Sequence, residues 1–288
     1  MRIRANEQTA VAPTMQKGWD ERAKTNAFHY ICSDRKEWDQ DSFFASGEAD
    51  YEELVAPVLA SFDFEPARKK MLEVGCGVGR VTRSFARRFE KVYALDVSQE
   101  MLQRARALHP NFQNIVWLHG DGAGFAQVPA RSVDFVFSYL VLQHVPTQAL
   151  ALGYLREVLR VLGNGGIFCF QFNSGEAPTM NWKGRMAWGV IDRLKEPIMG
   201  FNAEGIGRRL AAALGWDPLA AGRTWRGATL PVRDVLETIW NSGGSVRGVE
   251  AWGTTMTWCY GQKDRISLSD GSQAAQTPDP AGQVVPAR

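Results

Sequence analysis

The sequence lacks the features that mark secreted, metal-binding or membrane-spanning chains. Its four cysteines lie far apart, with no CxxC pair or metal-ligand spacing, which indicates reduced thiols and no metal site. No apolar run is long enough to cross a bilayer, and the first residues lack the apolar core of a secretory signal. The formal net charge of +2 gives no reason to expect nucleic acid or a membrane as partner. We therefore expect a cytoplasmic protein with neither nucleic acid nor a membrane as partner, and we leave its oligomeric state open.

What the sequence does have is a regular alternation over residues 70–173. Five short apolar runs, KMLEVG, KVYALDV, NIVWLHG, SVDFVFSYL and GGIFCFQFN, are separated by segments with helical spacing. This pattern predicts parallel βαβ units in a doubly wound α/β sheet with right-handed crossovers. Further on, LPVRDVLETIWNSGG predicts a helix, and SVRGVEAWG with TTMTWCYGQK predicts a β-hairpin at the sheet edge, which makes seven strands.

The remaining segments divide the chain further. Both ends are rich in Ala, Gln, Pro, Gly and Ser and have no periodic apolar positions, which predicts poor order there. The predicted organisation is a disordered N-terminus at 1–14, a helical region at 15–69, the core at 70–173, a helical insertion at 174–228, a closing helix and hairpin at 229–265, and a flexible tail at 266–288.

The strongest local signal is EVGCGVGR at residues 73–80, between the first predicted strand and a helix. Glycines there let the backbone turn tightly and approach a ligand closely. Ligands of this sheet type bind outside the carboxyl ends of the strands. The dinucleotide fingerprint would need glycine at Arg80, which disfavours an NAD-linked oxidoreductase. A tight turn without a ligand is the structural alternative.

Two carboxylates follow neighbouring strands. Asp96 ends the second strand, where it could accept both ribose hydroxyls of a nucleoside. The alternative is a helix N-cap, a role that Ser98 also offers. Asp121 follows the third strand and could accept a hydrogen bond from an adenine amino group, or it could form an Asx turn before Gly122.

Together, MLEVGCGVGRVT, VYALDVSQEML, LHGDGAGF, SVDFVFSYLVLQHVP and YLREVLRVLGNGGIFCFQF resemble the class I S-adenosylmethionine-dependent methyltransferases of small-molecule type. The resemblance implies a Rossmann-like fold, methyltransferase activity and S-adenosylmethionine as cofactor. LGNGG departs from the usual LxPGG at a position away from the cofactor. The core residues that the resemblance places at the cofactor are Glu73, Gly75, Cys76, Gly77, Gly79, Asp96, Val97, Met101, Asp121, Gly122 and Tyr139.

The resemblance also assigns roles within this set. The glycine turn lies against the methionine part of the cofactor, and Glu73 organises that turn and faces the cofactor's amino group. Asp96 matches the ribose-binding residue. Val97 and Met101 match residues that flank the adenine, and the pair at 121–122 matches its edge.

The segment at 19–47 resembles the N-terminal region of several small-molecule members, in which a helix and loop close over the cofactor. Trp19, Arg22, Tyr30 and Phe44 are the implied lid residues. The alternative is an amphipathic helix that packs on the sheet for stability.

Methyl transfer from a sulfonium is an in-line displacement whose leaving group needs no acid, so alignment of the reactants contributes most. A base is needed only if the attacking group must lose a proton. His144, in the loop after the fourth strand, is our candidate base, with support of that loop as the alternative. Tyr139 is a second candidate, or it packs under the cofactor.

The sequence limits the identity of the methyl acceptor mainly by excluding classes of substrate. The loop after the fourth strand reads SYLV at 138–141, without the [ND]PP[YFW] motif for exocyclic base amines or a Pro-Cys nucleophile. Four apolar residues of the insertion could line an acceptor pocket or form a local core: Met180, Trp182, Met186 and Trp188. Four arginines could bind a phosphate-bearing acceptor or form a solvated helix face: Arg208, Arg209, Arg223 and Arg226.

We therefore expect O- or N-methylation of a small metabolite or natural product. The alternative is a protein that binds the cofactor as a sensor or assembly partner without turnover. An NAD-dependent oxidoreductase is the third possibility.

Overall fold

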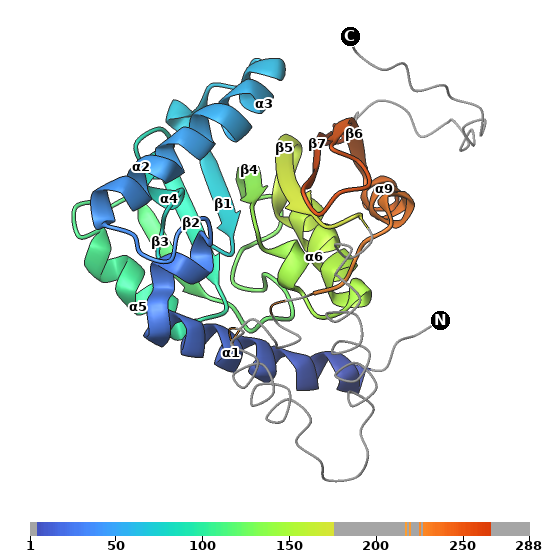
Figure 1. Cartoon of the computed structure of the whole chain (residues 1–288). Helices are drawn as coiled ribbons and strands as arrows, with labels where there is room; N and C mark the ends of the chain where they lie inside the picture. Colours follow the sequence, from blue (N-terminus) through green and yellow to red (C-terminus); the bar gives the residue numbers. More distant parts are fainter. Residues whose placement is uncertain (1–4, 176–216, 218, 220–224, 226, 266–288) are drawn as a thin grey trace, which may run out of the picture.

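The computed structural model describes residues 5–175, 217, 219, 225 and 227–265, and Figure 1 shows their arrangement. A seven-stranded sheet has the order β3-β2-β1-β4-β5-β7-β6. Its strands are β1 (Lys70–Val74), β2 (Lys91–Asp96), β3 (Ile115–His119), β4 (Val133–Ser138), β5 (Leu162–Phe172), β6 (Gly244–Glu250) and β7 (Thr257–Lys263). Strands β1 to β5 pair in parallel, and β7 pairs antiparallel with both β5 and β6. The predicted sheet and edge hairpin are confirmed.

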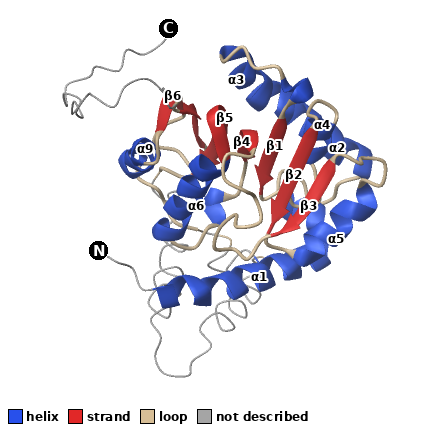
Figure 2. Cartoon of the chain, turned by 180° about the vertical axis from the view of Figure 1, so that it is seen from behind, coloured by secondary structure: helices blue, strands red, loops and turns tan. Residues whose placement is uncertain are grey.

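Helices cover both faces of the sheet (Figure 2). They include α4 (Thr82–Ala86), α5 (Gln99–Leu108), α6 (Gln148–Val161) and α9 (Val232–Asn241). Ser98 caps α5 by accepting from the Met101 amide at 3.1 Å, as expected from its position. Buried apolar residues form one cluster on each side of the sheet, around Phe168 and around Phe85. The four cysteines are buried and free. Among the described residues, no helix combines the length and the apolar character needed to cross a membrane.

The N-terminal region contains α1 (Ala5–Ile31), α2 (Gln40–Asp50), a π-helix η1 (Tyr51–Val55) and α3 (Ala56–Ser61). The expectation of disorder over 1–14 is wrong from Ala5 onward, because α1 begins there. Its first turns are polar but consist largely of good helix formers, and the helix is anchored by Met15, which is buried. A low content of apolar residues therefore did not mean disorder here.

The predicted lid region divides into two parts. Helix α1 crosses the end of the sheet toward which β1 points, whereas α2 lies beside α4 and continues through η1 into α3 (Figures 1 and 2). Helix α1 is also kinked at Asn26, whose φ of −163° and ψ of 86° are not helical. Among the described helices of this N-terminal region, α1 is the one placed to cover the carboxyl ends of the strands.

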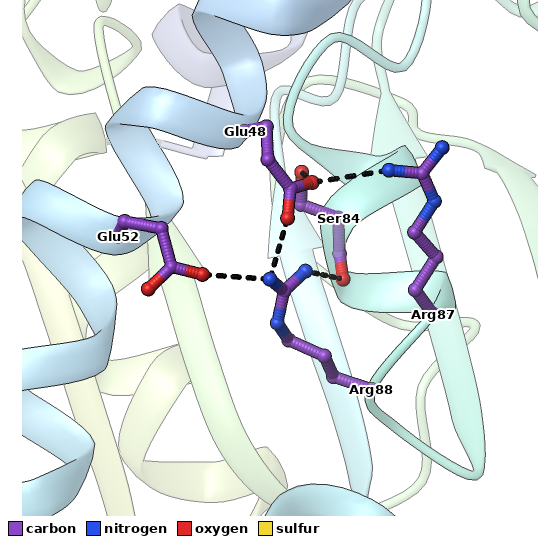
Figure 3. Close-up of polar contacts among 5 residues, drawn as sticks. All are labelled: Glu48, Glu52, Ser84, Arg87 and Arg88. Atoms are coloured by element: carbon purple, nitrogen blue, oxygen red, sulfur yellow. Dashed lines mark hydrogen bonds and ion pairs between the residues drawn. The ribbon is translucent and has the colours of Figure 1, made fainter.

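Helix α2 is tied to α4 by a polar network (Figure 3). Glu48 accepts from Ser84 Oγ at 2.6 Å and pairs with Arg87 and Arg88 at 3.3 and 2.5 Å. Arg88 also pairs with Glu52 at 2.7 Å, and the hydrogen bond from Arg88 lowers the pKa of Glu48. Single surface ion pairs contribute little, but a shared network fixes geometry. We therefore place α2 with the core rather than with a movable cover.

Candidate active site

A pocket lies at the carboxyl ends of β1, β2 and β4, beneath α1. It contains about 780 Å³ of atom-free space, including its opening to solvent. Its walls come from the glycine turn after β1, the ends of β2 and β3, the loop after β4, and α1. The residues that line it include Met15, Trp19, Tyr30, Ile31, Gly75, Gly77, Asp96, Val97, Met101, Gly122, Tyr139, Leu140 and His144. A doubly wound sheet binds ligands in this position.

The glycine turn uses backbone conformations that favour glycine. Gly75, Gly77 and Gly79 have φ of 75°, 55° and 86°. Gly75 and Gly77 line the pocket, and a Cβ on Gly77 would lie 2.7 Å from the Ile31 side chain of α1. A Cβ on Gly79 would instead lie 2.5 Å from His109 Nε2. Gly79 therefore serves packing beneath the turn and is not on the pocket wall.

Glu73 and Cys76 also lie off the pocket wall. Glu73 accepts a hydrogen bond from Thr82 Oγ1 at 2.5 Å, and burial raises its pKa to about 8. The Cys76 side chain belongs to the core cluster around Phe85. In the structure Glu73 is therefore held by Thr82, at the start of α4, and does not face the pocket.

Asp96 lies on the pocket wall and does not cap α5, whose N-cap is Ser98. It lines the pocket, while its Oδ2 accepts from the Gly77 amide and its Oδ1 from the Ser98 amide, each at 2.8 Å. Burial raises its pKa to about 6. A carboxylate has about four acceptor positions, so two remain for hydroxyl donors. Val97 and Met101 line the pocket next to it.

Asp121 forms the Asx turn that the sequence offered as the alternative to an adenine contact. Its side chain is exposed, and Oδ1 accepts from the amides of Ala123 at 2.8 Å and Gly124 at 3.2 Å, which is an Asx turn. Gly122 and Gly124 line the pocket, whereas Asp121 does not. The backbone of this loop, rather than the carboxylate, therefore faces the pocket.

The four residues expected in the lid lie at different places in the structure. Trp19 and Tyr30 line the pocket. Arg22 lies behind them, fully buried, with its guanidinium over the Trp19 ring at 4.9 Å and the Trp225 ring at 5.4 Å. Phe44 is away from the pocket, in a separate cluster with Phe43 and its neighbours. Phe44 therefore packs for stability, which was the alternative to a place in the lid.

Sequence reasoning missed Met15, Ile31 and Asp20 of α1. Met15 and Ile31 line the pocket, and Asp20 Oδ1 accepts from Ser98 Oγ at 2.6 Å and from the Glu100 amide at 3.1 Å. An acidic residue on a polar helix carries no sequence signal for such a contact. Asp20 attaches α1 to the amino end of α5, where negative charge is favourable.

His144 lines the pocket from the loop after β4. Its Nδ1 lies 2.5 Å from the Trp225 carbonyl oxygen, and its ring is 5.2 Å from Trp19. A carbonyl can only accept, so Nδ1 carries the proton and Nε2 is left as an acceptor. Burial lowers the pKa of His144 to about 4, which keeps the ring neutral at neutral pH.

Tyr139 also lines the pocket, next to His144 in the same loop. Burial raises its pKa to about 12, and its ring lies 5.1 Å from Trp258. A phenol that keeps its proton at neutral pH is a poor base. The structure therefore favours the packing role over the catalytic one for this residue.

The expected acceptor residues lie outside the described part of the chain. These are Met180, Trp182, Met186, Trp188, Arg208, Arg209, Arg223 and Arg226. The predicted tail at 266–288 is likewise outside it.

Fold and pocket together define an α/β protein of the class I methyltransferase type. Residues 72–170 match the family described as "Methyltransferase domain". The chain is 41% identical over 109 residues to a biotin biosynthesis bifunctional protein of Cellvibrio japonicus, covering 36% of this chain and 20% of that protein. It is 27% identical over 183 residues to a 2-methyl-6-phytyl-1,4-hydroquinone methyltransferase of Synechocystis, covering 62% of this chain and 55% of that protein.

Among solved structures, the magnesium protoporphyrin IX methyltransferase of Synechocystis with bound S-adenosylhomocysteine aligns with a TM-score of 0.56 at 14% identity. The alignment covers 88% of this chain and 99% of that one. The matches to the two curated relatives thus span between a fifth and about half of their length. Residues 72–170 thus form a methyltransferase domain, and the fold around them is that of the class I S-adenosylmethionine-dependent methyltransferases.

The pocket residues fit the cofactor of this family. The positive-φ glycines let the backbone approach a ligand closely, Asp96 has acceptor positions for ribose hydroxyls, and Val97 and Met101 offer apolar contacts for a base. When bound, S-adenosylmethionine would supply an electrophilic methyl group on a sulfonium.

Proposed function

We propose that this protein transfers a methyl group from S-adenosylmethionine to a hydroxyl or amine of a small metabolite or natural product. The observation that carries the proposal is His144, a neutral imidazole in the same pocket as the glycine turn and Asp96. The hydroquinone substrate in the name of the Synechocystis relative supports a hydroxyl-bearing acceptor. Trp19 and Tyr30 supply aromatic walls that suit an apolar or planar molecule.

The residues divide the work between binding and proton transfer. Asp96 and the glycine turn hold the cofactor, and the α1 wall excludes water over it. His144 Nε2, with Nδ1–H held by Trp225, takes the acceptor's proton. The attacking oxygen becomes strongly acidic as its bond to carbon forms, so a base of low pKa is sufficient.

The test is a methyl-transfer screen over phenols, amines and carboxylates with the full chain and S-adenosylmethionine. We expect turnover on at least one hydroxyl or amine acceptor. Binding of S-adenosylhomocysteine without turnover on any of them would favour the second candidate, a cofactor-binding sensor. Binding of NAD instead would exclude both.

Cofactor affinity should depend on the ionisation of Asp96. Its pKa in the free protein is raised to about 6 by burial, and hydroxyl donors favour the charged carboxylate. Affinity should therefore be constant above about pH 7 and fall as pH drops below 6, approaching tenfold per unit, because the protonated form must first lose its proton. Titration calorimetry with S-adenosylhomocysteine from pH 5 to 8 measures this. The variant Asp96→Asn should bind more weakly with a flatter profile, and an unchanged slope would assign the dependence to another group.

Helix α1 should respond to the cofactor. We expect amides in residues 19–31 to exchange more slowly with S-adenosylhomocysteine bound, since Trp19, Tyr30 and Ile31 line the pocket. Amides of α2, which the network of Figure 3 fixes to α4, serve as the internal control and should not change. Hydrogen–deuterium exchange with mass spectrometry separates the two segments. Equal exchange of α1 with and without ligand would make it a fixed structural cap.

A further inference from the structure

A chain of side-chain hydrogen bonds runs from β5 to His144 in the loop after β4, and the proposed function gives no role to its other members. It starts at Gln171 near the end of β5, a residue with no exposed surface. Gln171 Nε2 donates to the Thr255 carbonyl oxygen at 2.6 Å and to Gln143 Oε1 at 3.2 Å. Gln143 Nε2 in turn lies 3.3 Å from His144 Nε2.

The directions of these hydrogen bonds are fixed by the two ends of the chain. The Thr255 carbonyl can only accept, so the Gln171 amide nitrogen faces it and its oxygen faces the Leu140 amide, which donates at 3.1 Å. The Gln171 nitrogen then requires the oxygen of Gln143, which leaves the Gln143 nitrogen toward His144. From the other end, the Trp225 carbonyl requires Nδ1–H on His144, so Nε2 is an acceptor. Both ends give the same assignment.

A strained backbone position supports a positioning role. Leu140 lines the pocket with φ of 58°, in the left-handed region that bulky residues rarely adopt. Its amide is held by Gln171 Oε1. Such strain persists only where the surroundings determine it, and it is concentrated at functional sites.

We propose that Gln171 is a positioning residue that, through Gln143, orients the His144 imidazole in the free protein and fixes the loop at Leu140. Because Nε2 has a single lone pair, the acceptor's hydroxyl replaces the Gln143 amide at Nε2 when it binds. Gln171 lies too deep to touch a substrate and acts through its two neighbours. The contribution of Gln171 to catalysis rests on the proposed methyl transfer, whereas the series of hydrogen bonds can be tested without it. The two can therefore fail separately.

Imidazole nitrogen resonances of the isotope-labelled full chain test the chain of hydrogen bonds without any acceptor. The His144 signal among the four histidines is assigned by its loss in His144→Gln. We expect Nδ1–H in the wild type and a shifted Nε2 resonance in both Gln143→Met and Gln171→Met. The double variant should show no more than the larger single shift, because the two glutamines act in series. Gln113→Met, at an exposed glutamine bonded only locally to Pro110, is the control and should leave the signal unchanged.

Three outcomes would overturn the proposal: Nε2–H in the wild type, an unchanged Nε2 resonance in Gln171→Met, or additive shifts in the double variant. If Gln171→Met does not fold, the half-buried Gln143 carries the test. In Gln143→Glu, a carboxylate facing Nε2 should raise the pKa of His144 by one unit or more, and an unchanged pKa would contradict the contact. With a working acceptor, Gln171→Met should lower kcat roughly tenfold with cofactor affinity within a few-fold. Shifted resonances with normal turnover would support the series of hydrogen bonds but would show that it does not contribute to catalysis.

Discussion

Replacing His144 by Gln should lower turnover about 100-fold or more on a hydroxyl acceptor, within the range of about 10²–10⁴ for a general base. Glutamine keeps much of the volume and some hydrogen-bonding capacity but cannot take a proton near neutral pH. Because His144 lies at the loop after β4, whereas Asp96 and the glycine turn lie elsewhere on the wall, the affinity for S-adenosylhomocysteine should stay within a few-fold. Equal losses in kcat and kcat/KM would mark an interaction made only in the transition state.

The pH profile of the wild type sharpens this test. Burial lowers the pKa of His144 to about 4, so the base is unprotonated at every pH well above that value. With saturating cofactor, kcat should be level from neutral pH down to about 5 and should fall near pH 4 as the imidazole protonates. A decline centred near the ordinary histidine pKa of about 6.5 would mean that the ring is more solvated in the working complex. Near-normal turnover in His144→Gln would reassign the residue to positioning the loop.

The alternating apolar runs were sufficient to predict the sheet. Buried parallel strands such as KMLEV at β1 must be apolar on both faces, and their carboxyl ends must share one edge. The sequence therefore predicts that Gly75, Gly77 and Asp96 lie at one edge of the sheet, and all three line one pocket in the structure. The same logic could not separate Gly79, which has the same backbone conformation but faces His109.

Contacts made by α1 could not be predicted in the same way. Asp20 looks like an ordinary surface charge on a helix, yet it binds the start of α5. Arg22, which the resemblance places in the lid, is fully buried behind the pocket wall. The position of a helix across a sheet edge is set by tertiary packing rather than by local propensity. The polarity of the first residues likewise suggested disorder, although α1 begins at Ala5.

The buried Gln171 shows the same limit at the scale of one side chain. Its sequence neighbours, Phe170 and Phe172, mark a core strand, and a glutamine within such a strand gives no indication of its partners. Only the register of β5 beside β7, with the loop after β4 close by, brings Thr255, Gln143 and Leu140 within hydrogen-bond distance. Roles that depend on such long-range juxtaposition require the structure.

Replacing Asp96 by Ala should have the second large effect, a loss of at least tenfold in affinity for S-adenosylhomocysteine. The carboxylate holds the Gly77 and Ser98 amides at 2.8 Å and lines the pocket. Its removal takes away both the acceptor for ribose hydroxyls and the tie between the glycine turn and β2. A hydrogen bond to a charged group contributes about 1.5–3 kcal/mol, and each 1.4 kcal/mol or so is tenfold in affinity.

The matched control for this prediction is Asp121→Ala, at the neighbouring strand end. Asp121 is exposed and makes only the Asx turn, so its removal should change the dissociation constant by no more than a few-fold. Titration calorimetry on folded variants, with melting temperatures recorded alongside, measures both. If Asp96→Ala bound as tightly as the wild type, the ribose assignment would be wrong and the carboxylate would serve only to hold the turn. If Asp121→Ala lost as much affinity as Asp96→Ala, the adenine edge would be met by the carboxylate after all, and the loop at 121–124 would have to rearrange on binding.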